Sequence, residues 1–133
     1  MELEGDGLLE WFPIADCSKR LDVCDISWRL EDIVFTLVEE TSDNIEQKQR
    51  YELIWNSSDM ISYHVLDETY RADCWGTTEE FKEKGRFYAR KKSAYLKKMQ
   101  EMSPFFPEKA IDFTMVGINM VVDVIARNYP NVK

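Results

Sequence analysis

Histidine is nearly absent from this chain, and the residue patterns of the common cofactor sites are missing. His64 is the single histidine in 133 residues, so we set aside catalytic triads and histidine-rich metal sites. The three cysteines form no C-x-x-C pair, which removes the usual sequence signature of tetrahedral zinc. The five glycines are scattered and build neither a G-x-G-x-x-G motif nor a P-loop. We therefore predict no catalytic, cofactor-binding or metal-binding residues, and no cofactor.

Three groups of residues could still carry chemistry, and each has a simpler structural interpretation. His64 could act as a general base, but we favour a histidine on a strand face, opposite in direction to Tyr63 and Val65. The serines between Asn56 and Asp59 belong to a turn sequence rather than to a nucleophile elbow. The acidic clusters lack the alternating carboxylates and the central glycine of a calcium loop, so we interpret them as surface charge. These clusters are Asp16, Asp22 and Asp25, and Glu39, Glu40 and Asp43.

Signals for export or for membrane insertion are also lacking. The longest apolar region, from Met115 to Ala126, is interrupted by Asn119 and Asp123 and is shorter than the roughly 20 apolar residues that cross a bilayer. The first six residues are acidic where a secretory signal would be basic and then apolar. An odd number of cysteines fits free thiols in a reducing compartment. We expect a cytoplasmic protein with no membrane contact.

The chain has enough apolar material to build a core. Hydrophobic residues make up 44% of the sequence, with seven Phe, six Tyr and four Trp, which argues against global disorder. A chain of 133 residues lies within the usual size of one domain. We therefore predict a single domain over residues 1–133, in which residues 1–7 are mobile.

Charge is distributed unevenly along the chain. Residues 1–69 carry 17 acidic and five basic residues, whereas residues 70–133 carry eight acidic and 12 basic residues. Within the second part, the stretch Lys82–Lys98 has eight basic residues and one glutamate. Such polarity affects solubility, steering and the choice of partner rather than the fold.

Alternating apolar residues predict several strands and one helix. The clearest pattern places Tyr51, Leu53 and Trp55 on one face, followed by the turn at residues 56–59 and by a second alternating run, which we interpret as a β-hairpin with Trp55 buried. Ser93 is a good N-cap for a helix over residues 94–102, which Pro104 stops. The expected strands are 33–38, 49–55, 60–66, 86–90 and 110–116. The predicted fold class is α+β and β-dominant, with a single antiparallel sheet, hairpins and one or two short helices.

Three assignments leave alternatives open. Residues 8–14 are a short strand or a docking arm. One continuous helix from Glu79 would repeat aromatic residues every seven positions, but Gly85 and the basic run at residues 90–92 favour a strand followed by a short helix. Residues 118–127 match a helix or a strand, and their density of valine favours the second strand of a hairpin.

Part of the second half resembles short bacterial proteins of unknown function, some of them encoded beside polymorphic toxins and regarded as their immunity partners. The segments that carry this resemblance are Gly85–Tyr88, Ser93–Lys98, Ile111–Phe113 and Val121–Ile125, followed by Pro130. They cover under half of the chain. The resemblance implies a strand, a capped helix and a terminal hairpin, together with a role in protein interaction, and it transfers no functional residues.

These observations favour an interaction protein of the immunity type that binds a basic partner without catalysis. The alternative is a ligand-binding module or an enzyme, with a pocket lined by Trp28, Trp55 and Trp75. A third hypothesis is a small RNA-binding module that uses Lys82–Lys98, which the net charge of −8 disfavours. The partner and the oligomeric state stay open.

Overall fold

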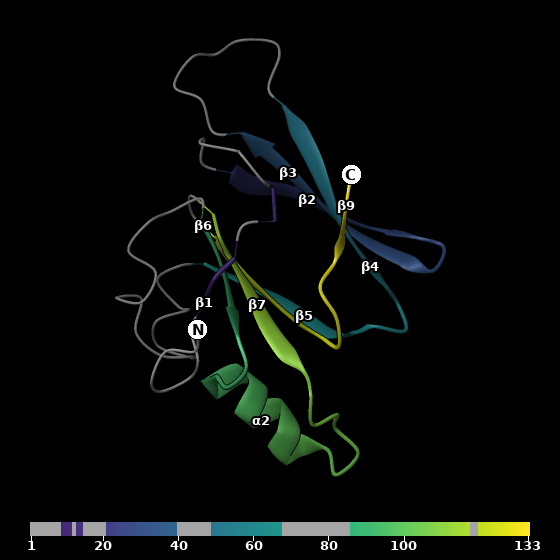
Figure 1. Cartoon of the computed structure of the whole chain (residues 1–133), viewed down its shortest axis with the longest axis vertical. Helices are drawn as coiled ribbons and strands as arrows, with labels where there is room; N and C mark the ends of the chain where they lie inside the picture. The colour runs from purple at the N-terminus through teal and green to yellow at the C-terminus, as the bar shows by residue number, and fades with distance from the viewer. Residues whose placement is uncertain (1–8, 12, 15–20, 40–48, 68–85, 118–119) are drawn as a thin grey trace.

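The computed structural model describes residues 9–11, 13–14, 21–39, 49–67, 86–117 and 120–133 (Figure 1). This part of the chain forms nine strands and one helix, with the strands in two antiparallel sheets that share one core. The five-stranded sheet has the order β1 (Leu9–Glu10), β6 (Arg86–Arg90), β7 (Ile111–Val116), β8 (Met120–Ala126), β5 (Met60–Asp67). The four-stranded sheet has the order β2 (Leu21–Arg29), β3 (Asp32–Glu39), β4 (Arg50–Asn56), β9 (Asn131–Val132). The β-dominant prediction is confirmed.

Aromatic side chains fill the space between the sheets. Trp55 is 1% exposed, as predicted, and its indole N–H donates to the carbonyl of Asn128 at 2.9 Å. The ring of Trp55 packs against Phe35 of the same sheet and against Phe113 of the opposite sheet, with centroids 5.3 and 5.4 Å away. Because each large buried ring removes 150–250 Å² from water, these contacts between the sheets supply much of the driving force for their packing.

The predicted single sheet and the predicted β4–β5 hairpin are wrong. β4 pairs with β3 and β9, while β5 pairs with β8 in the other sheet. The turn after Asn56, closed by a hydrogen bond from the Asp59 amide to the Asn56 carbonyl, is therefore a corner between the two sheets. An alternating pattern fixes the strand and its buried face but contains no information about which edge pairs with which strand.

Other local predictions are confirmed. Helix α2 (Ala94–Met102) begins at Ser93, whose hydroxyl accepts from the Leu96 amide. β6 precedes the helix, and β7 and β8 form the second hairpin, so residues 120–126 are strand rather than helix. β3 is buried on both faces, as its apolar composition indicated. β2 is longer than expected, with a bulge between Val23 and Asp25.

Helix α2 lies on the face of the five-stranded sheet that points away from the core (Figure 1). Tyr95 and Leu96 of the helix pack there against Ile125 of β8. In the part of the chain that the structure describes, no helix is long and apolar enough to cross a membrane. The prediction for residues 1–7 falls outside the described residues. The alternative of one continuous helix from Glu79 is wrong for residues 86–90, which form β6, and residues 79–85 lie outside the described part.

Candidate functional site

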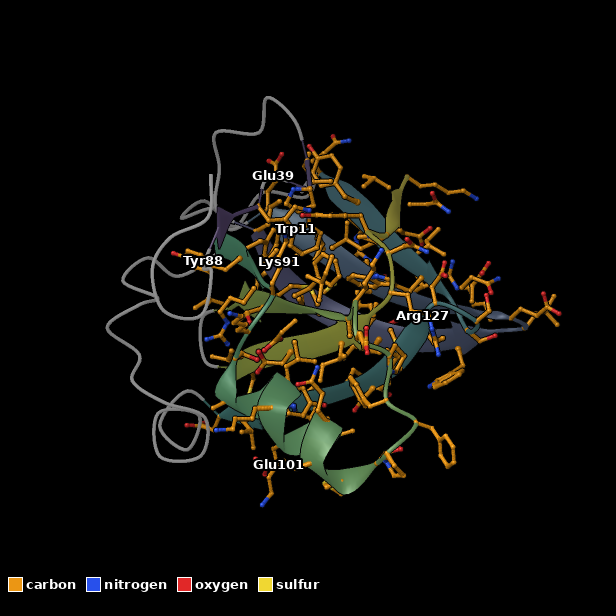
Figure 2. The ribbon with its side chains drawn as sticks, turned by 60° about the horizontal axis from the view of Figure 1, so that its bottom comes forward. Trp11, Glu39, Tyr88, Lys91, Glu101 and Arg127 are labelled. Atoms are coloured by element: carbon orange, nitrogen blue, oxygen red, sulfur yellow. The ribbon has the colours of Figure 1, made fainter. Side chains whose placement is uncertain are left out.

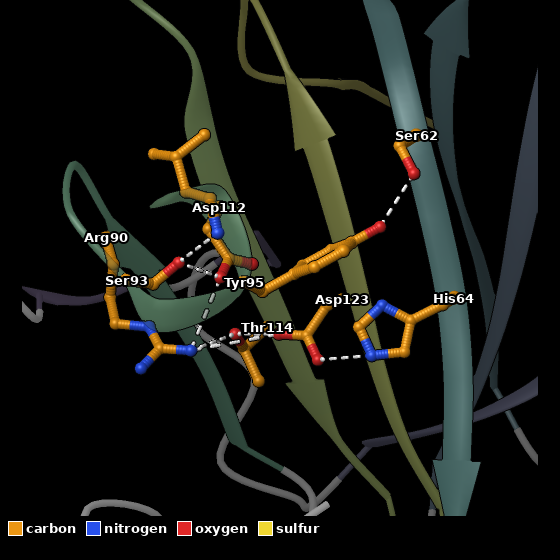
Figure 3. A network of polar contacts seen from close by, with 9 residues as sticks. Ser62, His64, Arg90, Ser93, Tyr95, Asp112, Thr114 and Asp123 are labelled. Carbon is orange, nitrogen blue, oxygen red and sulfur yellow. Dashed lines mark hydrogen bonds and ion pairs between the residues drawn. The ribbon is translucent and has the colours of Figure 1, made fainter. Parts of the chain in front are cut away.

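A group of buried polar residues lies between helix α2 and the five-stranded sheet (Figure 3). Directly opposed residues of neighbouring strands share a face, and the register places His64 opposite Asp123, Asp123 opposite Thr114, and Arg90 opposite Asp112. The helix and the residue that caps it contribute two more members. We call this group the polar network; its residues are Ser62, His64, Arg90, Ser93, Tyr95, Asp112, Thr114 and Asp123.

Two aspartates and one arginine form the centre of the polar network. Arg90 Nη2 lies 3.4 Å from Asp112 Oδ2 and 3.9 Å from Asp123 Oδ1. Thr114 donates its hydroxyl to Asp123 at 2.7 Å, and Ser93 donates to Asp112 at 2.6 Å. Both carboxyl groups have no exposure to solvent, and Arg90 is 3% exposed. One cation therefore faces two carboxyl groups in a region that water does not reach.

The excess acid in the polar network is compensated by a retained proton. Burial, together with the nearby charge of Asp123, raises the pKa of Asp112 from 3.8 to about 8, although Arg90 and Ser93 act in the opposite direction. Asp112 Oδ1 is buried and has no hydrogen-bond partner, so a negative charge there would be poorly solvated. At neutral pH the carboxyl group of Asp112 thus keeps its proton.

His64 joins the polar network from the edge strand β5. Its Nε2 lies 3.5 Å from Asp123 Oδ2, and its ring meets the Tyr95 ring edge-on at 4.2 Å. The Tyr95 hydroxyl shares a 2.7 Å hydrogen bond with Ser62, and burial raises the pKa of Tyr95. The predicted position of His64 on a strand face is confirmed, and Asp123 is an orienting partner that sequence reasoning missed.

The geometry of the polar network suits the attachment of helix α2. Ser93 both caps the helix and donates to Asp112 of β7, so one hydroxyl joins the helix N-terminus to the sheet. The carboxyl groups lie beneath the helix and cannot meet a solute without its displacement. Chemically the arrangement can hold and release a proton, and it stabilises a docked helix.

Charge is distributed unevenly between two parts of the described chain. Residues 21–39 and 49–67, which form β2 to β5, carry eight acidic and two basic residues, and none of the acidic side chains is buried. Residues 86–117 and 120–133 carry nine basic residues and four acidic residues, two of which are the buried Asp112 and Asp123. We call the surface of β2 to β5 the acidic side.

The acidic side carries two large apolar residues in water. Trp28, at the end of β2, is 63% exposed, and Leu30, in the tight β2–β3 turn, is fully exposed. Leu30 has a φ of 55°, a left-handed conformation that costs a side-chain-bearing residue about 1–2 kcal/mol. Arg29 between them pairs with Glu52 at 2.9 Å. The tip of the β2–β3 hairpin therefore exposes apolar surface to solvent, and its backbone conformation at Leu30 lowers the folding stability.

The tryptophan pocket anticipated from the sequence does not form in the described part. Trp55 is enclosed in the core, whereas Trp28 lies in solvent, so the two do not share a cavity. Trp75 lies outside the described residues. The serines at 57 and 58 occupy the corner turn, where Ser58 bonds to the Asn56 side chain.

The acidic clusters and the basic stretch are only partly described. Among described residues, no three His, Cys, Asp or Glu side chains come together as a metal group; Asp16, Glu40 and Asp43 lie outside. Glu39 accepts a hydrogen bond from Tyr51, and Cys24 is an exposed free thiol. Of the basic stretch, Arg90 is buried in the polar network, while lysines 91, 92 and 97 line a cavity of about 540 Å³ beside α2; Lys82 and Lys84 are not described.

In Figure 2, Glu101 lies on helix α2, and Arg127 is drawn on the other side of the ribbon from Tyr88 and Lys91. Arg127 donates to the Ser58 carbonyl at 2.9 Å and so supports that turn from β8's end. No protein-family model, no curated protein and no solved structure matches this chain, so the function is argued from its own geometry.

Proposed function

We propose that this protein is a cytoplasmic interaction domain of the immunity type, which binds a basic protein through its acidic side. The observation that carries the proposal is the pairing of charge with exposed apolar area. Eight acidic residues of β2 to β5 and the turns between them are outside the core, and Trp28 and Leu30 are exposed on the same part of the chain.

The two features serve different steps of binding. An acidic surface attracts a basic partner over a distance of about one Debye length, roughly 8 Å at physiological ionic strength, and raises the association rate. Exposed tryptophan supplies the large apolar contact that dominates many interfaces. Because Leu30 holds a strained backbone conformation without burying its side chain, a partner that covers it would explain why an apolar residue occupies this turn.

The test is capture of the native partner from a lysate of the source cells, with identification of what is bound. We expect to recover a basic protein. Its binding should persist after nuclease treatment and should weaken as the salt concentration is raised. The triple variant Asp25→Lys, Glu31→Lys, Asp32→Lys should slow its association about tenfold or more. The matched control reverses charge on the opposite side, with Lys97→Glu and Lys98→Glu, and should not slow it.

Two results would overturn the proposal. One is recovery of nucleic acid alone, which would favour an RNA-binding role for the basic side. The other is a partner whose association is as fast with the charge-reversed acidic side as with the parent protein. Circular dichroism on both variants checks that each is folded before binding is compared.

A further inference from the structure

The edges of the two sheets come together on one side of the sandwich. A cavity of about 330 Å³ is lined by residues of β2, β5 and β8, so the edge strand of the four-stranded sheet runs beside the edge of the five-stranded sheet. Asp22 of this lining lies against Gly117 after β7, where its Oδ1 occupies the space that a Cβ would need. We call this opening the β2–β5 seam; its lining residues are Asp22, Val23, Cys24, Asp25, Ile26, Val65, Met120 and Val122.

The floor of the β2–β5 seam is apolar and partly uncovered. Val65 is 37% exposed and Met120 is 42% exposed. Val65 is paired with Val122, a residue of the core cluster, and directly paired residues share a face. The exposed Val65 therefore belongs to the core face of its sheet and lies where the second sheet stops covering it.

Trp28 extends this apolar floor toward the hairpin tip. It is paired with Ile33, which is 1% exposed and belongs to the core cluster. Ile26, two residues earlier on the same strand, packs against that cluster as well. An incoming chain could thus continue the core packing of the sandwich along both edges.

The strand β5 offers a regular edge for a further strand. β5 pairs with β8 on one side, and the described residues place no strand on its other side. Its register is unbroken from Ser62 to Asp67, whereas β2 is bulged between Val23 and Asp25. A bulge disrupts the hydrogen-bond ladder of an edge, so β5 is the better template of the two.

The negative charge around the β2–β5 seam favours a basic binding partner. Asp22 and Asp25 belong to the lining, and Asp67 ends β5. A second copy of this chain would bring its own aspartates against these residues, and like charges across a strand pair are destabilising. Lysine or arginine would instead be attracted, so a basic chain fits better than a second copy.

We propose that the β2–β5 seam binds an extended segment of the basic partner, which adds a strand to β5. Side chains on one face of the added strand would meet the lining of the seam, with apolar residues over Val65 and Met120. Basic residues at the ends of that same face would meet Asp22, Asp25 and Asp67, which lie on the same side as the apolar floor. This inference rests on the proposed function, since it names the segment of the basic partner that is recognised.

The direct test uses a synthetic peptide in which every second residue, on one face of the strand, is valine in the middle and lysine at both ends, with serine on the other face. Peptide binding should slow amide hydrogen exchange within Ser62–Asp67. Val65→Lys and Met120→Lys, tested separately, should each weaken peptide binding at least tenfold, because they put a cation on the apolar floor. Phe105→Lys is the matched control: Phe105 is 92% exposed near the end of α2, and its replacement should leave the affinity unchanged.

Several outcomes would overturn the inference. These are equal binding of a scrambled peptide with the same composition, exchange protection outside β5, equal affinity of the three variants, or a dimer of this chain that uses β5. The native partner separates this failure from failure of the proposed function. If Val65→Lys keeps the partner and reversal of the acidic side loses it, the β2–β5 seam is refuted while the proposed function stands; if both variants keep it, both proposals fail.

Discussion

Replacement of Asp112 by asparagine should remove a large part of the pH dependence of folding stability. In the folded protein the pKa of Asp112 is raised from 3.8 to about 8. Below pH 4 the carboxyl is protonated whether the chain is folded or not. Between about pH 4 and pH 8 the unfolded chain loses this proton and the folded chain keeps it, so the free energy of unfolding falls as pH rises.

The size of this effect follows from the pKa difference. One pKa unit corresponds to about 1.4 kcal/mol, so the parent protein should lose roughly 4 kcal/mol of stability between pH 5 and pH 8 through this group alone. Asparagine fits the same space, keeps an oxygen for the Ser93 hydroxyl and has no proton to lose. Asp112→Asn should therefore match the parent protein near pH 5 and exceed its stability at pH 8.

Urea denaturation across this pH range measures the difference. Subtracting the curve of the variant from that of the parent cancels the contribution of titrating groups that are distant from Asp112. Asp25→Asn is the matched control, since Asp25 is exposed on β2, and it should leave the pH dependence as in the parent. Parallel curves for Asp112→Asn and the parent protein would refute the assignment of a retained proton to Asp112.

Four further changes test the remaining structure by the same denaturation assay. Arg90→Met leaves the two buried carboxyl groups without their cation and should cost about 3–5 kcal/mol; a loss under 1 kcal/mol would contradict the proposed balance of charge. Trp55→Ala opens a cavity between the sheets and should cost about 3–5 kcal/mol, unlike a change at a surface position. Ser93→Ala removes the helix cap and should cost about 0.5–2 kcal/mol, with α2 exchanging its amide hydrogens faster than β7. Leu30→Gly relieves the left-handed strain and should leave stability unchanged or raise it by about 1 kcal/mol, which a clear loss would contradict.

Local features were largely predictable from the sequence because they depend on neighbouring residues. The helix at 94–102 follows from a serine cap, an apolar stripe and a proline after the end, and all three act within one or two turns. Alternation gave the strand at 50–56 and the burial of Trp55, since a strand has only two faces. The assignment of residues 120–126 as strand succeeded on the density of valine, which is a property of single residues.

Strand pairing was not predictable by the same means. The runs on either side of residues 56–59 look like the arms of a hairpin, yet each arm pairs elsewhere, with β3 and with β8. The choice depends on how both sheets bury their aromatic residues together. That is a property of contacts between residues far apart in the chain, such as Trp55 with Phe113, and alternation does not report it.

One feature of the sequence indicates the polar network. Asp112 and Asp123 each interrupt a run of apolar residues in a strand. A carboxyl group in such a position is buried whichever face it takes, and a buried carboxyl group needs a partner or a proton. The signal predicts that a cation or a second acid lies nearby, although it does not identify Arg90, which is three strands away from His64 in the sheet order.

The proton on Asp112 also sharpens the separation of charge on the surface. An uncharged Asp112 does not offset the charge of the exposed lysines near helix α2. The two described parts therefore differ in the sign of their net charge, with β2 to β4 in the sheet that does not carry helix α2. Under the proposed function, a basic partner would be attracted to one part and repelled by the other, which would orient its approach before any contact forms. Trp28 and the lining residues of the β2–β5 seam on β2 and β5 belong to the acidic part, so the proposal predicts that the partner meets them first.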